Sequence, residues 1–199
     1  MIAIIDYGTG NLRSVEKALE HVGAKATITQ NIDVIRSCAK VVLPGVGAME
    51  PAMKKLNELN LIPIIKETIA QKKPFLGICL GLQLLFEKSE EGGNVSGLGI
   101  FKGQVLKFRQ LKVPQIGWNQ LTIKNSSSPL FAGIKNPSFV YFCHSYFVKP
   151  SDDKMVASLT HYGIDFASSI RQDNVFGLQF HPEKSQTVGL QILKNFVNL

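Results

Sequence analysis

Residues 74–87 read Pro-Phe-Leu-Gly-Ile-Cys-Leu-Gly-Leu-Gln-Leu-Leu-Phe-Glu, and their pattern is the strongest indication of the fold. The apolar run Phe75–Ile78 predicts a buried strand, and Leu80–Lys88 predicts the helix that follows it. Between them stands Cys79, with a glycine two positions away on each side. Small neighbours allow the backbone to bend sharply at such a strand–helix junction. The sequence therefore predicts a rigid, exposed turn that carries a cysteine, a side chain already nucleophilic near neutral pH.

A second polar segment, Gln179-Phe180-His181-Pro182-Glu183, lies near the C-terminal end of the chain. Two residues spaced by two positions on extended backbone project to the same side, so His181 and Glu183 are expected to lie together. A thiol, an imidazole and a carboxylate that orients the imidazole form a complete nucleophile and base set. The candidate catalytic residues are therefore Cys79, His181 and Glu183. The alternative reading is a buried packing cysteine and a His-Pro-Glu turn without chemistry.

Strand-like and helix-like segments alternate along the first half of the chain. The expected strands are residues 2–6, 25–29, 40–43 and 75–78, and the expected helices are residues 12–22, 49–57, 62–71 and 80–88. Asn11 is the expected N-cap of the first helix. Repeated βαβ units predict a parallel sheet with helices on both faces. Catalytic groups in such sheets gather where the strands end, which is where Pro44–Gly47, Cys79 and His181 fall.

The second half is richer in strand-like segments. They lie near residues 101–108, 120–123, 139–148, 155–159, 166–171 and 175–180, with turn clusters at 125–129 and 149–153 and a final amphipathic helix over 185–197. The prediction is one α/β domain over residues 1–199. It has a flavodoxin-like, mostly parallel central sheet and an added antiparallel section.

The composition fits a folded, globular chain. Hydrophobic residues make up 45% of the 199 residues and charged residues 19%, which allows a large buried core. The net charge of +7 predicts a solvated lysine surface rather than nucleic-acid binding, because no run exceeds two adjacent basic residues. No segment approaches the roughly 20 apolar residues of a membrane span. The N-terminus reads as a first strand and not as a signal peptide.

The three cysteines, Cys38, Cys79 and Cys143, are sparse and none has C-x-x-C spacing. This pattern predicts neither a metal site nor a disulfide scaffold, and it fits a protein of the reducing cytoplasm. Cys38 and Cys143 lack the glycine-rich surroundings of Cys79, so both are expected to be packing residues.

Three segments together resemble the class I (triad-type) glutamine amidotransferases: residues 77–81, the loop Pro44-Gly45-Val46-Gly47, and Phe180-His181-Pro182-Glu183. Within that class, four segments are similar to the glutaminase subunits of imidazole glycerol phosphate synthases: residues 6–12, Gly117-Trp118-Asn119, His144-Ser145-Tyr146 and residues 181–185. The resemblance spans essentially the whole chain. It departs at Gln115-Ile116, where that family more often has His-Met.

The resemblance implies hydrolysis of glutamine through a cysteine thioester, without a cofactor. An oxyanion is expected to accept hydrogen bonds from the backbone of Leu80, the residue after the nucleophile, and of Val46 or Gly47. By resemblance, five residues help bind glutamine: Gly47, Gln83, Glu91, and the backbone of Ser145 and Tyr146. Glu91 suits the cationic α-amino group.

Ammonia released in water is mostly protonated, so the resemblance also implies a partner that receives it directly. That partner is a (βα)₈-barrel cyclase subunit of histidine biosynthesis, forming a heterodimer, and the candidate docking residues are Asn11, Trp118, Tyr141 and Lys184. Three alternatives remain at this point. One is a paralogue that supplies ammonia for amidination of a nucleotide sugar, and another is a non-catalytic flavodoxin-like regulatory module. The third is a cysteine peptidase, which glutamine hydrolysis without peptide cleavage would exclude.

Overall fold

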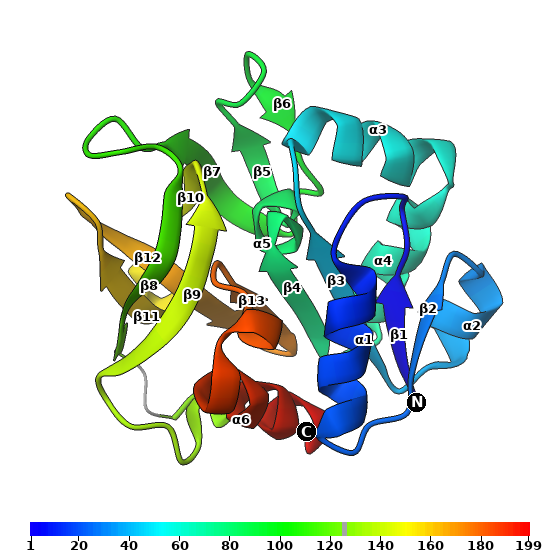
Figure 1. Cartoon of the computed structure of the whole chain (residues 1–199). Coiled ribbons are helices and arrows are strands. Elements are labelled where there is room, and N and C mark those ends of the chain that lie inside the picture. The colour runs from blue at the N-terminus through cyan, green and yellow to red at the C-terminus, as the bar shows by residue number, and fades with distance from the viewer. Residues whose placement is uncertain (125–126) are drawn as a thin grey trace.

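The computed structural model describes residues 1–124 and 127–199, and a group of parallel strands forms one side of its sheet (Figure 1). Five strands lie in the order β2-β1-β3-β4-β13, and each neighbouring pair is parallel. Their bounds are β1 Ile2–Ile5, β2 Ala26–Thr29, β3 Lys40–Gly45, β4 Phe75–Cys79 and β13 Val175–Leu178. The predicted parallel α/β core is therefore confirmed.

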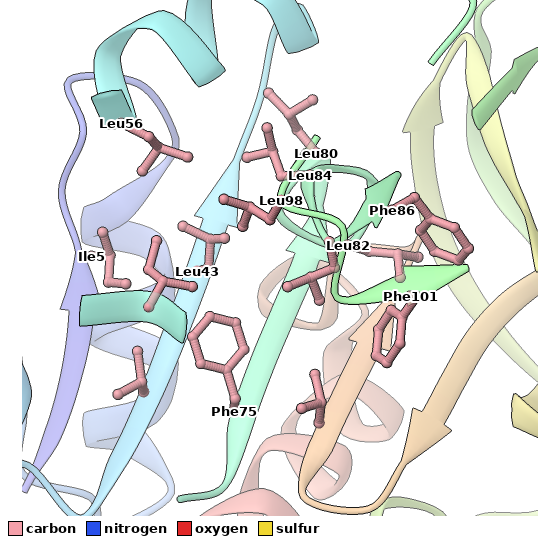
Figure 2. Close-up of a cluster of buried hydrophobic side chains, with 14 of the residues drawn as sticks. Ile5, Leu43, Leu56, Phe75, Leu80, Leu82, Leu84, Phe86, Leu98 and Phe101 are labelled. Atoms are coloured by element: carbon pink, nitrogen blue, oxygen red, sulfur yellow. The ribbon is translucent and has the colours of Figure 1, made fainter. Parts of the chain in front are cut away.

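Helices cover both faces of this parallel part. Successive strand residues point to opposite faces, so Ile5, Leu43 and Phe75 share one side, which Figure 2 shows with Leu56 packed above them. The helices on that side are α2 Ile32–Ser37, α3 Met49–Glu58 and α4 Leu61–Ala70. The opposite face packs against α1 Leu12–His21 and α6 Gln186–Val197. Two apolar layers thus hold the strand ends in fixed positions.

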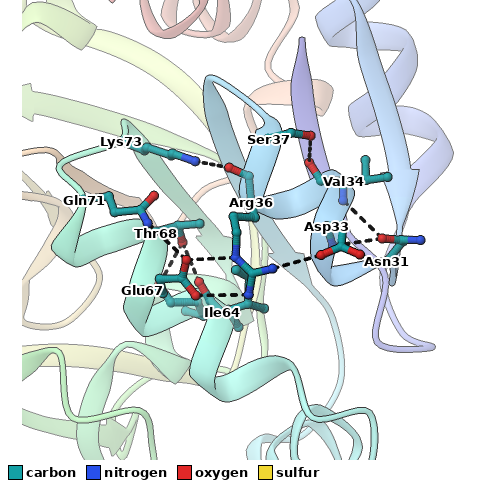
Figure 3. Close-up of polar contacts among 11 residues, drawn as sticks. Asn31, Asp33, Val34, Arg36, Ser37, Ile64, Glu67, Thr68, Gln71 and Lys73 are labelled. Atoms are coloured by element: carbon teal, nitrogen blue, oxygen red, sulfur yellow. Dashed lines mark hydrogen bonds and ion pairs between the residues drawn. The ribbon is translucent and has the colours of Figure 1, made fainter.

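Helix α2 is a short element that the sequence analysis did not predict. Its N-cap Asn31 accepts hydrogen bonds from the backbone N–H groups of Asp33 and Val34, at 2.9 and 3.1 Å. Arg36 then bridges to Glu67 on α4, with Nε 3.0 Å from Oε1 (Figure 3). Six residues are too few to show a clear helical period in the sequence. The N-cap residue Asn31 was therefore the sequence signal that could have indicated this helix.

The helix after Cys79 is shorter than the sequence indicates. Helix α5 spans only Leu80–Leu84, and Phe86–Ser89 forms strand β5 instead of continuing the predicted helix to Lys88. Strand β5 pairs in parallel with β7, where Phe86 lies beside Phe101 with ring centroids 5.7 Å apart. Residues 82–86 are apolar except for Gln83 and suit a buried helix and a buried strand alike, so the pairing with the distant strand β7 decides between the two.

The remaining strands form the antiparallel section, in which all pairings except β5–β7 are antiparallel. Their bounds are β6 Val95–Ser96, β7 Phe101–Lys107, β8 Gln115–Ile123, β9 Ser138–His144, β10 Tyr146–Pro150, β11 Val156–His161 and β12 Asp165–Gln172. The single strand predicted for 139–148 is wrong. The chain leaves β8 at His144, passes Ser145, and pairs with β7 from Tyr146 onward.

Strand β8 begins earlier than predicted and contains Gly117-Trp118-Asn119. The turn predicted for 125–129 lies partly outside the described residues, and the final helix is confirmed as α6. Within the described ranges 1–124 and 127–199, no helix is both long and apolar enough to cross a membrane.

Candidate active site

Cys79 stands at a strained backbone position at the end of β4. Its φ and ψ are +54° and −108°, a conformation that side chains rarely adopt. A Cβ on Gly81 would lie 1.7 Å from the Leu43 carbonyl oxygen, and one on Gly77 would lie 2.8 Å from the Gly81 carbonyl oxygen. The two glycines are therefore sterically required. The residue is only 5% exposed, so the expected exposed apex is wrong: the thiol lies in the floor of a pocket.

The ends of three neighbouring strands bring the predicted catalytic and oxyanion-binding residues together. Strands β3, β4 and β13 are adjacent and parallel, with Gly45 opposite Cys79 and Leu178 opposite Ile78. Their carboxyl ends therefore point to the same edge of the sheet, as Figure 1 shows. The loop after β3, the Cys79 turn and the segment after β13 meet at this edge.

His181 is held by its own backbone as well as by its side chain. Its N–H donates to the Tyr141 carbonyl at 2.9 Å, and its carbonyl accepts from the Ser185 hydroxyl at 2.6 Å. The same hydroxyl oxygen accepts from the Tyr141 N–H at 2.9 Å. The ring Nδ1 lies 2.8 Å from Glu183 Oε1, and the two side chains are 3% and 1% exposed. Glu183 therefore fixes the ring and leaves Nε2 for the thiol.

The pKa of His181 reflects these neighbours. Burial lowers it, but hydrogen bonds to the Cys79 thiol and the Glu183 carboxylate, together with their charges, raise the pKa to about 10. The imidazole is thus protonated at neutral pH while both partners are in place. His144, which is also buried, shows the opposite behaviour: burial lowers its pKa to about 4, and the charge of His181 adds to this effect.

A pocket of about 290 Å³ is lined by both Cys79 and His181. It also contains every residue that was predicted to bind glutamine or an oxyanion, namely Val46, Gly47, Leu80, Gln83, Glu91, Ser145 and Tyr146. Glu183 lies outside the pocket and supports His181. Pro114, Cys143, His144 and Lys184 complete the lining.

Two of the pocket residues, Glu91 and Gln83, already make hydrogen bonds to other groups of the chain. Glu91 Oε2 accepts from the Met49 N–H at 2.7 Å, at the first turn of α3, where a negative charge is favoured. The Gln83 side-chain amide donates to the Tyr146 carbonyl at 2.9 Å and to Gln179 Oε1 at 3.1 Å. With its nitrogen engaged, Gln83 has its oxygen to offer a ligand.

Three of the four candidate docking residues lie together beside the pocket. Trp118 is 47% exposed, and its ring meets Tyr141 edge-on with centroids 6.2 Å apart. Lys184 Nζ lies 5.7 Å from the centre of the Tyr141 ring. Asn11 is exposed at the start of α1, after the carboxyl end of β1. We call the outward side of the β8–β9 ribbon, residues 116, 118, 139, 141 and 143, the ribbon face.

Sequence reasoning gave no role to Ser185 or Gln179, although both lie in the quoted motifs around His181. It also read Cys143 as a packing residue, and this is wrong, because Cys143 is exposed. Its neighbour His144 points to the opposite, buried side of β9, as alternation requires. Cys38 is buried as expected.

The whole chain matches one family model. The model of glutamine amidotransferase class-I matches residues 3–199. The chain therefore belongs to the class I glutamine amidotransferases.

Three curated relatives of high identity share one name. The chain is 56% identical to "Imidazole glycerol phosphate synthase subunit HisH" of Aquifex aeolicus, over 97% of this chain and 94% of that protein. Proteins of the same name from Thermosynechococcus vestitus and Methanocaldococcus jannaschii are 53% and 52% identical, over 100% of this chain and 96% and 100% of theirs.

Solved structures share the fold at lower identity. A crystal structure of glutamine amidotransferase superposes with a TM-score of 0.78 at 15% identity, covering 100% of both chains. The structure of PurLQS from Thermotoga maritima gives 0.77 at 19% identity, covering 99% of this chain and 97% of that one. These matches establish the architecture.

Proposed function

We propose that this chain is the glutaminase subunit of an imidazole glycerol phosphate synthase, which hydrolyses glutamine and passes ammonia to a cyclase subunit. One observation carries the proposal: His181 contacts Cys79 in a pocket of about 290 Å³, and Glu183 holds the His181 ring through Nδ1. The relatives of that name, which match over nearly their full lengths, support the choice of synthase.

The proposed reaction begins with attack of the Cys79 sulfur on the side-chain amide carbon of glutamine. The thiol proton resides on His181, which delivers it to the departing nitrogen, so that ammonia leaves and a thioester remains. A water molecule then gives a proton to His181 and attacks the thioester. Glutamate is released, and the proton taken from water stays on His181, which restores the starting pair of thiolate and protonated imidazole.

Both steps pass through an oxyanion on the former amide oxygen. We assign its donors to the Leu80 N–H, at the start of α5, and to the N–H of Val46 or Gly47 in the neighbouring loop. Each such donor commonly contributes about 3–4 kcal/mol to transition-state stabilisation. Gly47, in this loop, has a φ of +97°, a backbone conformation that residues other than glycine rarely adopt.

Glutamine binding is assigned to residues that line the pocket together with Cys79. The carboxylate of Glu91 suits the α-ammonium group, and the free oxygen of Gln83 accepts a hydrogen bond from the ligand. The backbone at Ser145 and Tyr146, where the chain passes from β9 to β10, supplies further polar groups.

The partner is assigned to the ribbon face, together with Asn11 and Lys184. This face exposes Ile116 at 61%, Trp118 at 47% and Phe139 at 56%, beside the pocket that would release ammonia. A (βα)₈-barrel cyclase docked here would receive ammonia before it meets bulk water.

The test combines the purified chain with the barrel cyclase, glutamine and the phosphoribulosyl formimino-aminoimidazole ribotide acceptor. We expect glutamine-dependent formation of imidazole glycerol phosphate. A stable complex without cyclisation would reject the assignment, and cyclisation fed only by added ammonium salt would reject the glutaminase role. A barrel subunit from a nucleotide-sugar amidination system serves as the control partner, and preferential binding to it would favour the paralogue.

A further inference from the structure

Gln179 is buried beside the nucleophile and outside the pocket lining. It follows β13, its backbone N–H donates to the Ser168 carbonyl at 2.9 Å, and its side chain has no exposed surface. Its Nε2 lies 3.8 Å from Cys79 Sγ, within the longer range of hydrogen bonds to sulfur. We propose that Gln179 is a fixed hydrogen-bond donor to the Cys79 sulfur, and that it stabilises the reactive thiolate. The inference rests on Cys79 being the nucleophile.

The orientation of the Gln179 amide follows from a chain of hydrogen bonds. The Tyr146 carbonyl can only accept, and it accepts from Gln83 Nε2 at 2.9 Å. Gln83 must therefore present its NH₂ group, which also donates to Gln179 Oε1 at 3.1 Å. With its oxygen committed to Gln83, Gln179 must turn its NH₂ group toward the sulfur. The reversed amide would set NH₂ against NH₂ and oxygen against sulfur.

The Tyr146 carbonyl is itself fixed by a second donor. His144 Nδ1 lies 2.7 Å from it, so the proton of this neutral imidazole is on Nδ1. Both lone pairs of the carbonyl oxygen are then engaged, by His144 and by Gln83. The backbone predicted to bind glutamine is thus connected through two buried amides to the sulfur that attacks it.

A donor and an acceptor compete for the sulfur. The Cys143 carbonyl lies 3.9 Å from Sγ and can accept only from the protonated thiol. The Gln179 N–H group can donate to the sulfur and favours the charged form. The ionisable neighbours of the thiol include His181, which contacts it, and Tyr7, whose raised pKa comes first from burial and in part from the Cys79 charge. Glu91 and Lys184 line the same pocket as Cys79. Glu183 and His144 interact electrostatically with His181.

The test measures alkylation of Cys79 by iodoacetamide as a function of pH, with the label located by mass spectrometry. In Gln179→Met, which has similar length and no N–H donor, we expect the midpoint of the alkylation profile to rise by about half to one pH unit. Gln115→Met is the matched control, because Gln115 is also a buried glutamine, on β8. Its midpoint should equal that of the natural chain.

A second readout separates this role from a structural one. Because Gln179 is fully buried and outside the pocket lining, its loss in the complete synthase should lower kcat for glutamine hydrolysis about tenfold and leave KM unchanged. A lower melting temperature with an unshifted alkylation midpoint would show that Gln179 only supports the fold.

If Gln179→Met does not fold, Gln83→Met tests the same chain of bonds. It frees the Gln179 amide to rotate, so we expect a smaller rise of the midpoint in the same direction. An unchanged midpoint would overturn the proposal. If the natural chain itself shows no selective alkylation of Cys79, the proposed function fails before the role of Gln179 is reached.

Discussion

The parallel part of the sheet and the antiparallel section contribute different things to one pocket. The parallel strands β3, β4 and β13 place Val46 and Gly47, Cys79 and His181 at adjacent ends, on backbone packed so closely that glycine is required at Gly77 and Gly81. The antiparallel section adds Cys143, Ser145 and Tyr146 to the pocket and carries the exposed ribbon face. We infer that the proposed catalytic residues depend on the parallel part, whereas the proposed partner surface lies mainly on the strands added to it.

The largest expected effect is on the reacting group of the parallel part. Cys79→Ser should lower glutamine hydrolysis by the synthase at least ~10³-fold, because the weaker nucleophile breaks a catalytic set that works as a unit. Glutamate release measures it, and an unchanged melting temperature shows that the fold survives. A ribbon-face change such as Phe139→Ser should leave the thiol chemistry intact, and an equal loss there would break the comparison.

The second effect concerns backbone packing. Gly81→Ala should cost about 3 kcal/mol of unfolding free energy or more, since the new methyl group would meet the Leu43 carbonyl at 1.7 Å. Gly133→Ala, in the antiparallel section, is the matched control: its φ is +73° but its Cβ would meet nothing within 4 Å. It should cost about 1–2 kcal/mol. Urea unfolding compares the two, and equal losses would contradict the difference in packing.

The third prediction concerns the two buried histidines, His144 and His181, whose pKa values shift in opposite directions. The folded chain holds His144 neutral down to about pH 4, whereas an unfolded chain protonates it near pH 6.5. The unfolded state then binds more protons in this window, so stability falls as the pH falls from 6.5 to 4, by about 3 kcal/mol from this residue. His144→Phe should lose that much less stability between pH 7 and pH 4 than the natural chain. Parallel pH profiles for both would contradict the assignment.

The smallest effect is expected on the ribbon face. Trp118→Ala should weaken binding of the cyclase subunit about tenfold or more, because an exposed aromatic ring is a common interface anchor. Leu199→Ala is the control, since Leu199 is 43% exposed at the C-terminus, at the opposite edge of the sheet. Calorimetric titration measures both. Equal affinities for the two variants would remove the ribbon face as the docking surface.

The same contrast explains what the sequence could predict. Cys79 with its flanking glycines, and His181 with Glu183, are recognisable because each signal is local and the strand ends bring them together. The role of Gln179 depends on β13 lying beside β4, and the contacts of Gln83 depend on where β10 passes. Neither pairing has a local signature.

The errors have the same origin. Phe86 became part of a strand because it meets Phe101, and Cys143 became exposed because β9 has one buried and one solvent-facing side. Both outcomes are set by the partner strand. The roles of the residues predicted to bind glutamine came from family resemblance. These roles stay predictions, although the residues all line one pocket.

We propose that the Cys79 thiol, activated by His181, is the nucleophile that attacks glutamine. The most direct test treats the chain with acivicin, an electrophilic glutamine analogue, and locates the adduct by peptide mass spectrometry. The account predicts one adduct per chain, on Cys79, prevented by excess glutamine, with buried Cys38 and exposed Cys143 unmodified. An adduct on Cys143, or an even distribution that glutamine does not affect, would contradict it.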